Sequence, residues 1–183
     1  MKRTKNPAKE AEYRKRAADL VAQMTLHEKV SQMLSWAPAI ERLGIPAYNW
    51  WSEGIHGVGR AGTATVFPQA IGMAAAFDED MMEQVGNAVG VEARGKYNMC
   101  RAHGDRDIFK GLTVWAPNIN IFRDPRWGRG HETYGEDPFL TSRLGVRFVE
   151  GMQGDDPDYL QAAACAKHFA VHSGPESDRH HFN

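Results

Sequence analysis

The spacing of apolar residues predicts helices in five stretches of the chain. These are residues 9–24, 26–34, 67–76, 79–98 and 138–152. The two long inner helices repeat apolar side chains every three or four positions, which gives each of them one buried face. Asp78 and Asp137 suit N-caps, Pro138 suits the first helical position, and Thr25 opens a capping box. The starts of three helices are therefore marked in the sequence.

Three short apolar runs predict buried strands, over residues 45–51, 112–116 and 162–169. A polar loop follows each run, and the order strand, loop, helix repeats along the chain. Parallel α/β folds bind their ligands at the edge where the strands end. No glycine-rich phosphate-binding sequence follows a strand, which favours a barrel over an open nucleotide-binding sheet.

The predicted fold class is α/β, as a partial (β/α)8 TIM-type barrel. Because a whole barrel takes about 250 residues, we expect this 183-residue chain to supply about five or six of its strands. Residues 1–24 are predicted to form an N-terminal helical extension. Residues 25–183 are predicted to form an incomplete barrel domain.

Charge and composition exclude several classes of partner. The formal net charge is −1, which creates no field that would attract nucleic acid or an anionic membrane. No apolar run reaches the ~18 residues that span a bilayer, and no secretory signal is seen. We therefore expect a cytoplasmic protein without nucleic-acid or membrane partners, and leave secretion and the oligomeric state open. Cys100 and Cys165 stand alone, so neither a disulfide framework nor a zinc cluster is expected.

The stretch 123–137, RDPRWGRGHETYGED, has neither a helical nor a strand period. It combines three arginines and four carboxylates with a Trp, a Tyr and several glycines. A solvated linker would lack such aromatics, so the loop is typical of the wall of a pocket for a polar ligand. An arginine such as Arg126 or Arg129 can bridge vicinal hydroxyls, or the charges can pair with one another and brace the loop. We expect both arrangements among different members.

Glu53 follows the first predicted strand, beside Trp50 and Trp51. A carboxylate in this place could accept hydrogen bonds from sugar hydroxyls while an indole face stacks on the sugar ring. The alternative is a solvated turn residue beside two indoles that belong to the core. From these residues alone both interpretations stay open.

Two further groups lie near the end of the chain. Lys167 and His168 lie at the tip of the third predicted strand, where both side chains can reach one site. Asp178 stands two residues before His180, a spacing at which a carboxylate and an imidazole could act together in proton transfer. None of the histidines has the spacing of a common metal motif, so no metal is expected.

Four long motifs closely resemble those of glycoside hydrolase family 3, in its β-xylosidase, α-arabinofuranosidase and β-glucosidase branch. In chain order they are RLGIPAYNWWSEGIHG, TVFPQAIGMAAAFD, VWAPNINIFRDPRWGRGHETYGEDPFLTSRLGVRFVEGMQGD and AACAKHFAVHSGPE. The resemblance implies a first domain that is a (β/α)8 barrel, of which this chain is the N-terminal portion, and cleavage of terminal β-linked sugars with retention. Retention requires two carboxyl groups about 5 Å apart, a nucleophile and an acid/base. No metal or organic cofactor is implied.

The resemblance also implies roles for particular residues. Glu53, Arg129, Lys167 and His168 match residues that bind the terminal sugar, and Trp115 matches an aromatic that shapes the same subsite. The family's nucleophile Asp and, in this branch, its acid/base Glu belong to later segments. The chain is therefore expected to be a fragment without either catalytic carboxylate. Its substrate would be an oligosaccharide or an aryl or alkyl β-glycoside, such as a xyloside or glucoside.

Two alternatives remain at this stage. The β-N-acetylglucosaminidase branch of the family takes its acid/base from an Asp-x-His after the strand that carries the Lys-His pair, and Asp178 with His180 resembles that placement. The second alternative is a carbohydrate-binding module without catalysis, which would use the same sugar-binding residues.

Overall fold

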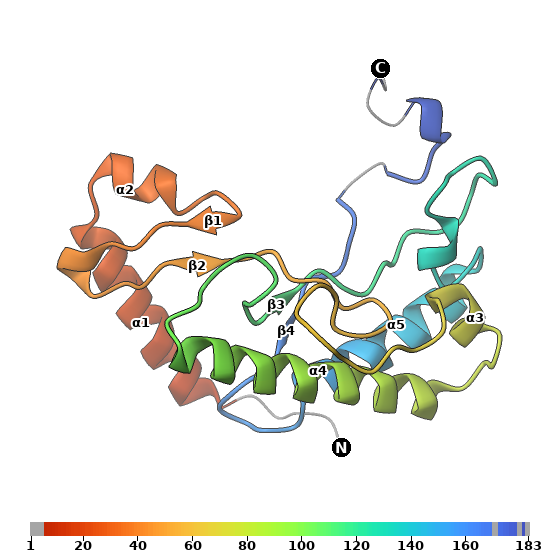
Figure 1. Ribbon diagram of the computed structural model, residues 1–183, viewed down its shortest axis with the longest axis horizontal. Helices are drawn as coiled ribbons and strands as arrows, with labels where there is room; N and C mark the ends of the chain where they lie inside the picture. Colours follow the sequence, from red (N-terminus) through yellow and green to blue (C-terminus); the bar gives the residue numbers. More distant parts are fainter. Residues whose placement is uncertain (1–5, 170–171, 179–180, 182–183) are drawn as a thin grey trace.

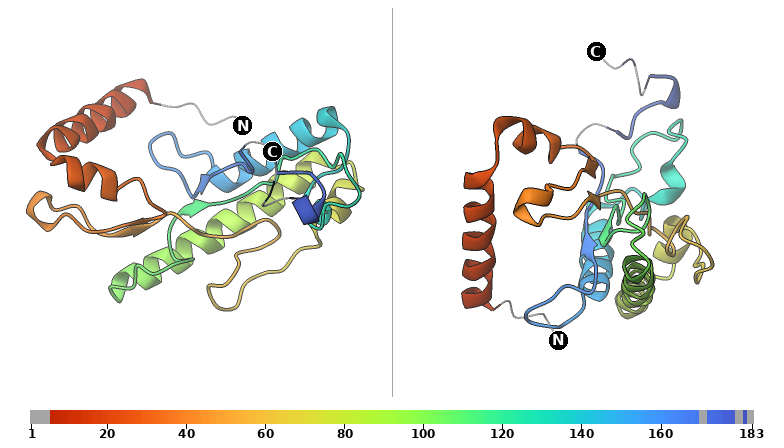
Figure 2. Two further views of the ribbon diagram at one scale, coloured as in Figure 1. Left: turned by 90° about the horizontal axis from the view of Figure 1, so that it is seen from above. Right: turned by 60° about the vertical axis from the view of Figure 1, so that its left-hand side comes forward.

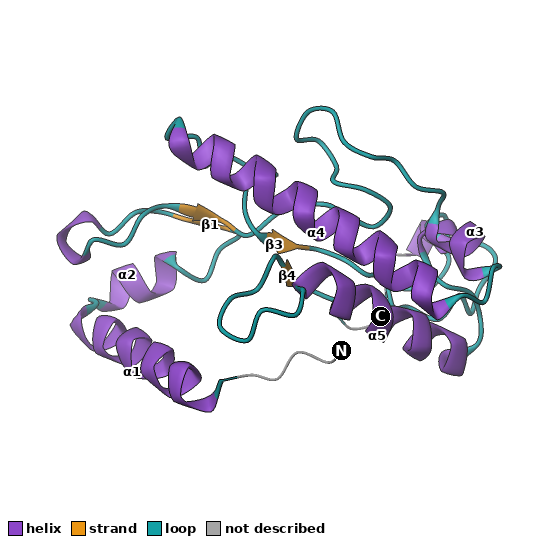
Figure 3. Cartoon of the chain, turned by 90° about the horizontal axis from the view of Figure 1, so that it is seen from below, coloured by secondary structure: helices purple, strands orange, loops and turns teal. Residues whose placement is uncertain are grey.

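The computed structural model describes residues 6–169, 172–178 and 181 (Figure 1). Its α-helices are α1 (Pro7–Gln23), α2 (Leu26–Ser31), α3 (Ala70–Ala74), α4 (Glu79–Ala102) and α5 (Pro138–Gln153). Its strands are β1 (Trp36–Ala37), β2 (Tyr48–Asn49), β3 (Thr113–Val114) and β4 (Ala163–Ala164). Loops connect most of these elements (Figure 3).

The five predicted helices are all present, and their capping residues act as expected. Asp78 accepts a hydrogen bond from the Met81 amide at the start of α4, and Asp137 accepts two at the start of α5. Thr25 and Glu28 form the capping box that opens α2. The main differences are that α2 and α3 are shorter than predicted and that α4 continues to Ala102.

The core lies between α4 and α5, which run side by side beneath β3 and β4 (Figures 1 and 2). Met82 of α4 and Phe148 and Met152 of α5 have no exposed surface. Glycines allow the two helices to approach closely: a Cβ on Gly86 would lie 2.3 Å from the Phe148 carbonyl oxygen. Burial of these apolar side chains, at roughly 25 cal/mol per Å², is the main contribution that holds the helix pair together.

Three segments of the chain run parallel above this helix pair. β3 pairs with β4 in parallel register, Thr113 opposite Ala163 and Val114 opposite Ala164. Ser52 forms a parallel bridge to Val114 on the other side of β3. The parallel α/β arrangement is thereby confirmed, and it is the arrangement of adjacent barrel strands.

Two expectations about the strands were wrong. Among the described residues there are three parallel segments rather than five or six, and the regular strands are two residues long. The run 45–51 is a regular strand only at Tyr48–Asn49, where it pairs antiparallel with β1. No alternation of apolar and polar residues around Trp36 indicates this hairpin. Trp50 and Trp51 are 45% and 38% exposed, so they do not form the core as one interpretation required.

Helix α1 lies apart from the helix pair, on the side of the β1–β2 hairpin (Figures 1 and 2). None of its residues is buried. Asn6 donates to Asp158 at 3.1 Å, and the Lys9 ammonium lies 3.4 Å from the same carboxylate. Polar contacts therefore tie α1 to the loop before β4. The division of the chain at residue 24 stays a prediction.

Candidate functional site

The segments that follow the three parallel strands meet at one edge, as the sequence predicts. Glu53 follows Ser52, Asn118 and Asn120 follow β3, and Lys167 follows β4. A parallel bridge between Asn118 and Lys167 holds the last two segments together. The loop 123–137 then returns to the same edge and adds Arg129 and Glu132. We call Glu53, Arg129, Glu132, Lys167 and His168 with the two asparagines the polar cluster.

Lys167 lies at the centre of the polar cluster. Its ammonium nitrogen is 3.4 Å from Glu53 Oε2 and 4.0 Å from Glu132 Oε2. Its side chain is only 11% exposed, so water screens these interactions less than on an open surface. The cluster therefore places one cation between two carboxylates, at the edge where parallel barrels bind ligands.

Arg129 is the second cation of the polar cluster. Its Nε and Nη2 donate to the two carboxylate oxygens of Glu132, each at 2.6 Å. Burial raises the pKa of Glu132, but the hydrogen bonds and charge of Arg129, together with Lys167, outweigh it and hold this pKa below its ordinary value. The Glu132 hydrogen bond raises the pKa of Arg129. Glu132 is therefore ionised at neutral pH.

His168 is fixed by Asn120. The Asn120 side-chain oxygen accepts from the backbone N–H of His168 at 2.9 Å, and it lies 2.8 Å from Nδ1 of the ring. Because a backbone N–H can only donate, this oxygen is the acceptor in both contacts, which assigns the ring proton to Nδ1. Nε2 then presents a lone pair. Burial, followed by the neighbouring His172, lowers the pKa of His168 to about 3.

We expect His168 to stay neutral, with its proton on Nδ1, between pH 8 and pH 5. The imidazole of the unfolded chain binds a second proton below about pH 6.5, whereas in the folded chain it does so only near pH 3. A fall in pH from about 6.5 to about 3 therefore destabilises the fold. Ring ¹⁵N and ¹³C chemical shifts, assigned by loss of the signal in His168→Gln, measure both properties. A titration midpoint above pH 5 would contradict this assignment.

Two indoles adjoin the polar cluster. The Trp51 and Trp115 rings stack with centroids 4.7 Å apart and an angle of 16° between their planes. The Trp51 indole N–H donates to Glu53 Oε1 at 2.9 Å, so the carboxylate is held by an indole on one side and by Lys167 on the other. The resemblance implies Trp115 here, and of the two indoles that the sequence places beside Glu53, Trp51 is the one that stacks on Trp115.

The loop 123–137 is braced as one interpretation required. Arg126 binds Asp124 through two nitrogens, and the pKa of Asp124 falls to about 2, mainly because of that side-chain hydrogen bond. Trp127 is 2% exposed and packs against Phe122. Of the two candidate arginines, Arg129 belongs to the polar cluster and Arg126 forms a brace at the surface.

The alternative Asp-x-His pair lies partly outside the residues that the structure describes. Asp178 ends a short 3-10 helix, Glu176–Asp178, and accepts a hydrogen bond from Ser177, while His180 lies outside the described residues. Within the described part of the chain, no three His, Cys, Asp or Glu side chains are grouped as a metal site requires.

Sequence reasoning missed Asn118 and Asn120, and it placed Glu132 only among the bracing charges of its loop. The two asparagines alternate along PNIN directly after a predicted strand, so both fall on one face at its carboxyl end. That spacing could have identified them. Nothing local distinguishes Glu132 from the other carboxylates of its loop.

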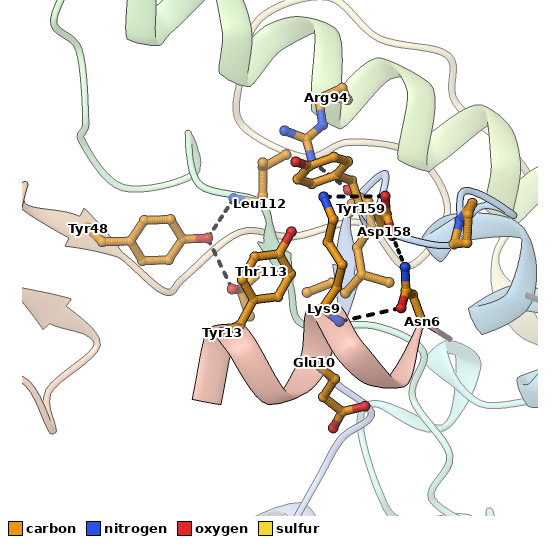
Figure 4. A pocket seen from close by; sticks show the side chains of 14 residues that line it. Asn6, Lys9, Glu10, Tyr13, Tyr48, Arg94, Leu112, Thr113, Asp158 and Tyr159 are labelled. Carbon is orange, nitrogen blue, oxygen red and sulfur yellow. Dashed lines mark hydrogen bonds and ion pairs between the residues drawn. The ribbon is translucent and has the colours of Figure 1, made fainter. Parts of the chain in front are cut away.

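A separate hollow lies at the opposite edge of the strands, between α1 and the starts of β3 and β4 (Figure 4). Its volume is about 430 Å³, and its lining includes Tyr13, Tyr48, Thr113 and Tyr159. The Tyr48 hydroxyl accepts from the Leu112 amide at 2.8 Å. In parallel barrels this edge serves stability rather than ligand binding, so the polar cluster remains the candidate site.

The fold and the polar cluster together define a parallel α/β-barrel protein with a site for a polar ligand at the carboxyl edge of its strands. The chain belongs to glycosyl hydrolase family 3, since the model of the family's N-terminal domain matches residues 16–182. None of the described helices is long and apolar enough to cross a membrane.

Several known proteins are similar to this chain. It is 51% identical over 173 residues to a xylan 1,4-β-xylosidase of Xylanibacter ruminicola, covering 93% of this chain and 20% of the relative. It is 50% identical to the probable β-D-xylosidase 7 of Arabidopsis thaliana, covering 86% of this chain and 22% of that protein. The chain thus spans about a fifth of the length of these curated relatives.

Solved structures show the same fold. A family 3 exo-β-xylosidase, solved with a xylobiose aziridine activity-based probe, superposes with a TM-score of 0.79 at 38% identity, over 91% of this chain and 22% of that one. The β-glucosidase DesR from Streptomyces venezuelae, solved with D-glucose, gives a TM-score of 0.69 at 32% identity, over 90% of this chain and 20% of that one. The prediction of a partial barrel is confirmed.

Proposed function

We propose that the protein is a retaining, exo-acting β-xylosidase or β-glucosidase, and that this chain binds the terminal sugar of its substrate. The observation that carries the proposal is the position of Lys167 between Glu53 and Glu132, with Arg129 beside it, at the carboxyl edge of the strands. The similarity to β-xylosidases supports the same conclusion, and plant-cell-wall oligosaccharides are the proposed substrates.

Each proposed contact follows from the chemistry of the side chain. Lys167 and Arg129 donate hydrogen bonds to sugar hydroxyls, and the Glu53 carboxylate accepts them. The neutral His168 ring accepts a hydrogen bond from a further sugar hydroxyl at Nε2. Trp115, stacked against Trp51, provides an apolar wall for the C–H face of the sugar. A pyranose offers both a ring of hydroxyls and apolar C–H faces, so these groups suit a sugar.

Glu132 of the polar cluster is not suited to act as a general acid. Retaining hydrolysis needs one carboxylic acid that is protonated, with a raised pKa, and a second carboxylate as nucleophile. Glu132 has a lowered pKa and is bound to Arg129 through both oxygens. We therefore propose that the nucleophile Asp and the acid/base Glu come from parts of the longer protein outside these residues, and that this chain positions the sugar for them.

A titration of the 183-residue chain with D-xylose, followed by Trp fluorescence, tests this proposal. We expect a saturable change, because the Trp51–Trp115 pair lines the sugar site. Xylitol keeps the C2, C3 and C4 hydroxyls of xylose without the ring and is the control ligand, for which no saturation is expected. The chain should leave 4-nitrophenyl β-D-xyloside intact. Turnover of that substrate would contradict the proposed absence of both catalytic carboxylates.

A further inference from the structure

We infer that Glu132 is a positioning residue of the sugar site: it orients the Arg129 guanidinium and keeps it away from Glu53, without touching the sugar itself. This inference rests on the proposed function. It assigns a role to a carboxylate that the sequence analysis leaves among the bracing charges of its loop.

The fork between Arg129 and Glu132 decides which hydrogens a ligand can reach. Nε and one hydrogen of Nη2 are used by the two Glu132 oxygens, at 2.6 Å each. The remaining Nη2 hydrogen and both Nη1 hydrogens lie on the outer edges of the planar guanidinium. Glu132 therefore fixes the plane of the group. It leaves one Nη2 and one Nη1 hydrogen side by side on the end edge and the second Nη1 hydrogen on the edge away from Glu132.

Charge balance gives Glu132 a second effect. Two cations, Arg129 and Lys167, share two carboxylates, Glu53 and Glu132, and the charge of Glu53 also acts on Arg129. If Glu132 were neutral, Glu53 would be the stronger remaining acceptor for both cations. The carboxylate proposed to accept sugar hydroxyls would then be occupied by Arg129. Glu132 thus leaves Glu53 available for the sugar.

A chain of hydrogen bonds also connects Glu132 to His168. Asn118 donates to Glu132 Oε2 at 3.3 Å, and the Asn118 side-chain oxygen accepts from the Asn120 amide at 3.0 Å. Asn120 in turn holds His168. Glu132 is therefore the one carboxylate among the described residues of the polar cluster that contacts Arg129, Lys167 and the asparagine pair.

The variants Glu132→Gln and Glu132→Asp of the 183-residue chain test the inference, with Glu136→Gln as the matched control. Glu136 is an exposed carboxylate of the same loop. We expect Glu132→Gln to weaken D-xylose binding roughly 10- to 100-fold, because a charged bidentate acceptor is lost. Glu132→Asp keeps the charge but shortens the reach, so an intermediate loss is expected. The control should bind as the unmodified chain does.

A second readout separates positioning from general loss of structure. The side-chain Nε–H signal of Arg129 should be sharp and slow to exchange in the unmodified chain and lost in Glu132→Gln, while far-ultraviolet circular dichroism shows that the variant remains folded. Unchanged xylose affinity in a folded Glu132→Gln variant would overturn the inference and leave the proposed function standing. If Glu132→Gln does not fold, Glu132→Asp with full affinity overturns it. An unmodified chain that does not bind xylose removes both proposals.

Discussion

Replacing Lys167 with Met is expected to reduce D-xylose affinity by at least about 100-fold, because it removes one partner of a largely buried charge pair. Its ammonium lies 3.4 Å from Glu53 and 4.0 Å from Glu132. Without it the two carboxylates share a single cation, Arg129. The pKa of Glu132 then rises, since Lys167 is one of the charges that lower it.

Lys9→Met is the matched control for this prediction. Lys9 also forms an ion pair, with Asp158 at 3.4 Å, but it lies on α1 at the opposite edge of the strands and is more exposed. Isothermal titration with D-xylose measures both variants, and far-ultraviolet circular dichroism reports folding. If a folded Lys167→Met chain bound xylose as well as Lys9→Met did, Lys167 would have no place in the sugar site.

The second large effect concerns stability. A Cβ at Gly151 of α5 would lie 2.0 Å from the Glu83 carbonyl oxygen and 2.8 Å from the Asn87 amide nitrogen of α4. Both are backbone atoms inside a helix, so they cannot move aside without separating α4 from α5. We expect Gly151→Ala to lower the free energy of unfolding by about 3 kcal/mol or more.

Gly95→Ala, in the same helix pair, is expected to have the opposite effect on the free energy of unfolding. Gly95 lies in the interior of α4, and a Cβ there meets nothing within 4 Å. Alanine should raise the free energy of unfolding by about 0.5–1 kcal/mol, because glycine loses more backbone entropy in a helix. Urea unfolding of both variants measures the difference. Equal stabilities would mean that α4 and α5 do not pack as closely as the structure shows.

The helices were predictable because their determinants are local. Asp78 and Asp137 bind the first free amides of α4 and α5, and the apolar period continues through each helix. The close approach of α4 to α5 was not predictable in this way. It depends on Gly86 and Gly151, whose importance follows only from the backbone atoms that face them.

The strands were less predictable because pairing is a long-range property. The apolar run 162–169 reads as one strand, but regular pairing covers Ala163–Ala164 and a bridge at Lys167. Phe169 is fully exposed. An apolar run records only that a segment is suited to burial, whereas its pairing depends on a partner elsewhere in the chain.

The candidate site was predicted through two different routes. The carboxyl-edge rule brought Glu53 and Lys167 together from the residues alone, and the structure places them 3.4 Å apart. The family resemblance selected Arg129 over Arg126, which no local pattern could do. The tautomer of His168 and the fork on Glu132 required coordinates, since both depend on contacts between distant segments.

The central claim is that the polar cluster binds the terminal sugar. A ¹H–¹⁵N correlation spectrum of the 183-residue chain, titrated with D-xylose, tests it most directly. We expect saturable shifts of the Lys167 and His168 amides and the Trp51 indole N–H, with residues around Tyr13 and Tyr159 unaffected. Shifts confined to the hollow beneath α1, or none in the polar cluster of a folded chain, would contradict the claim.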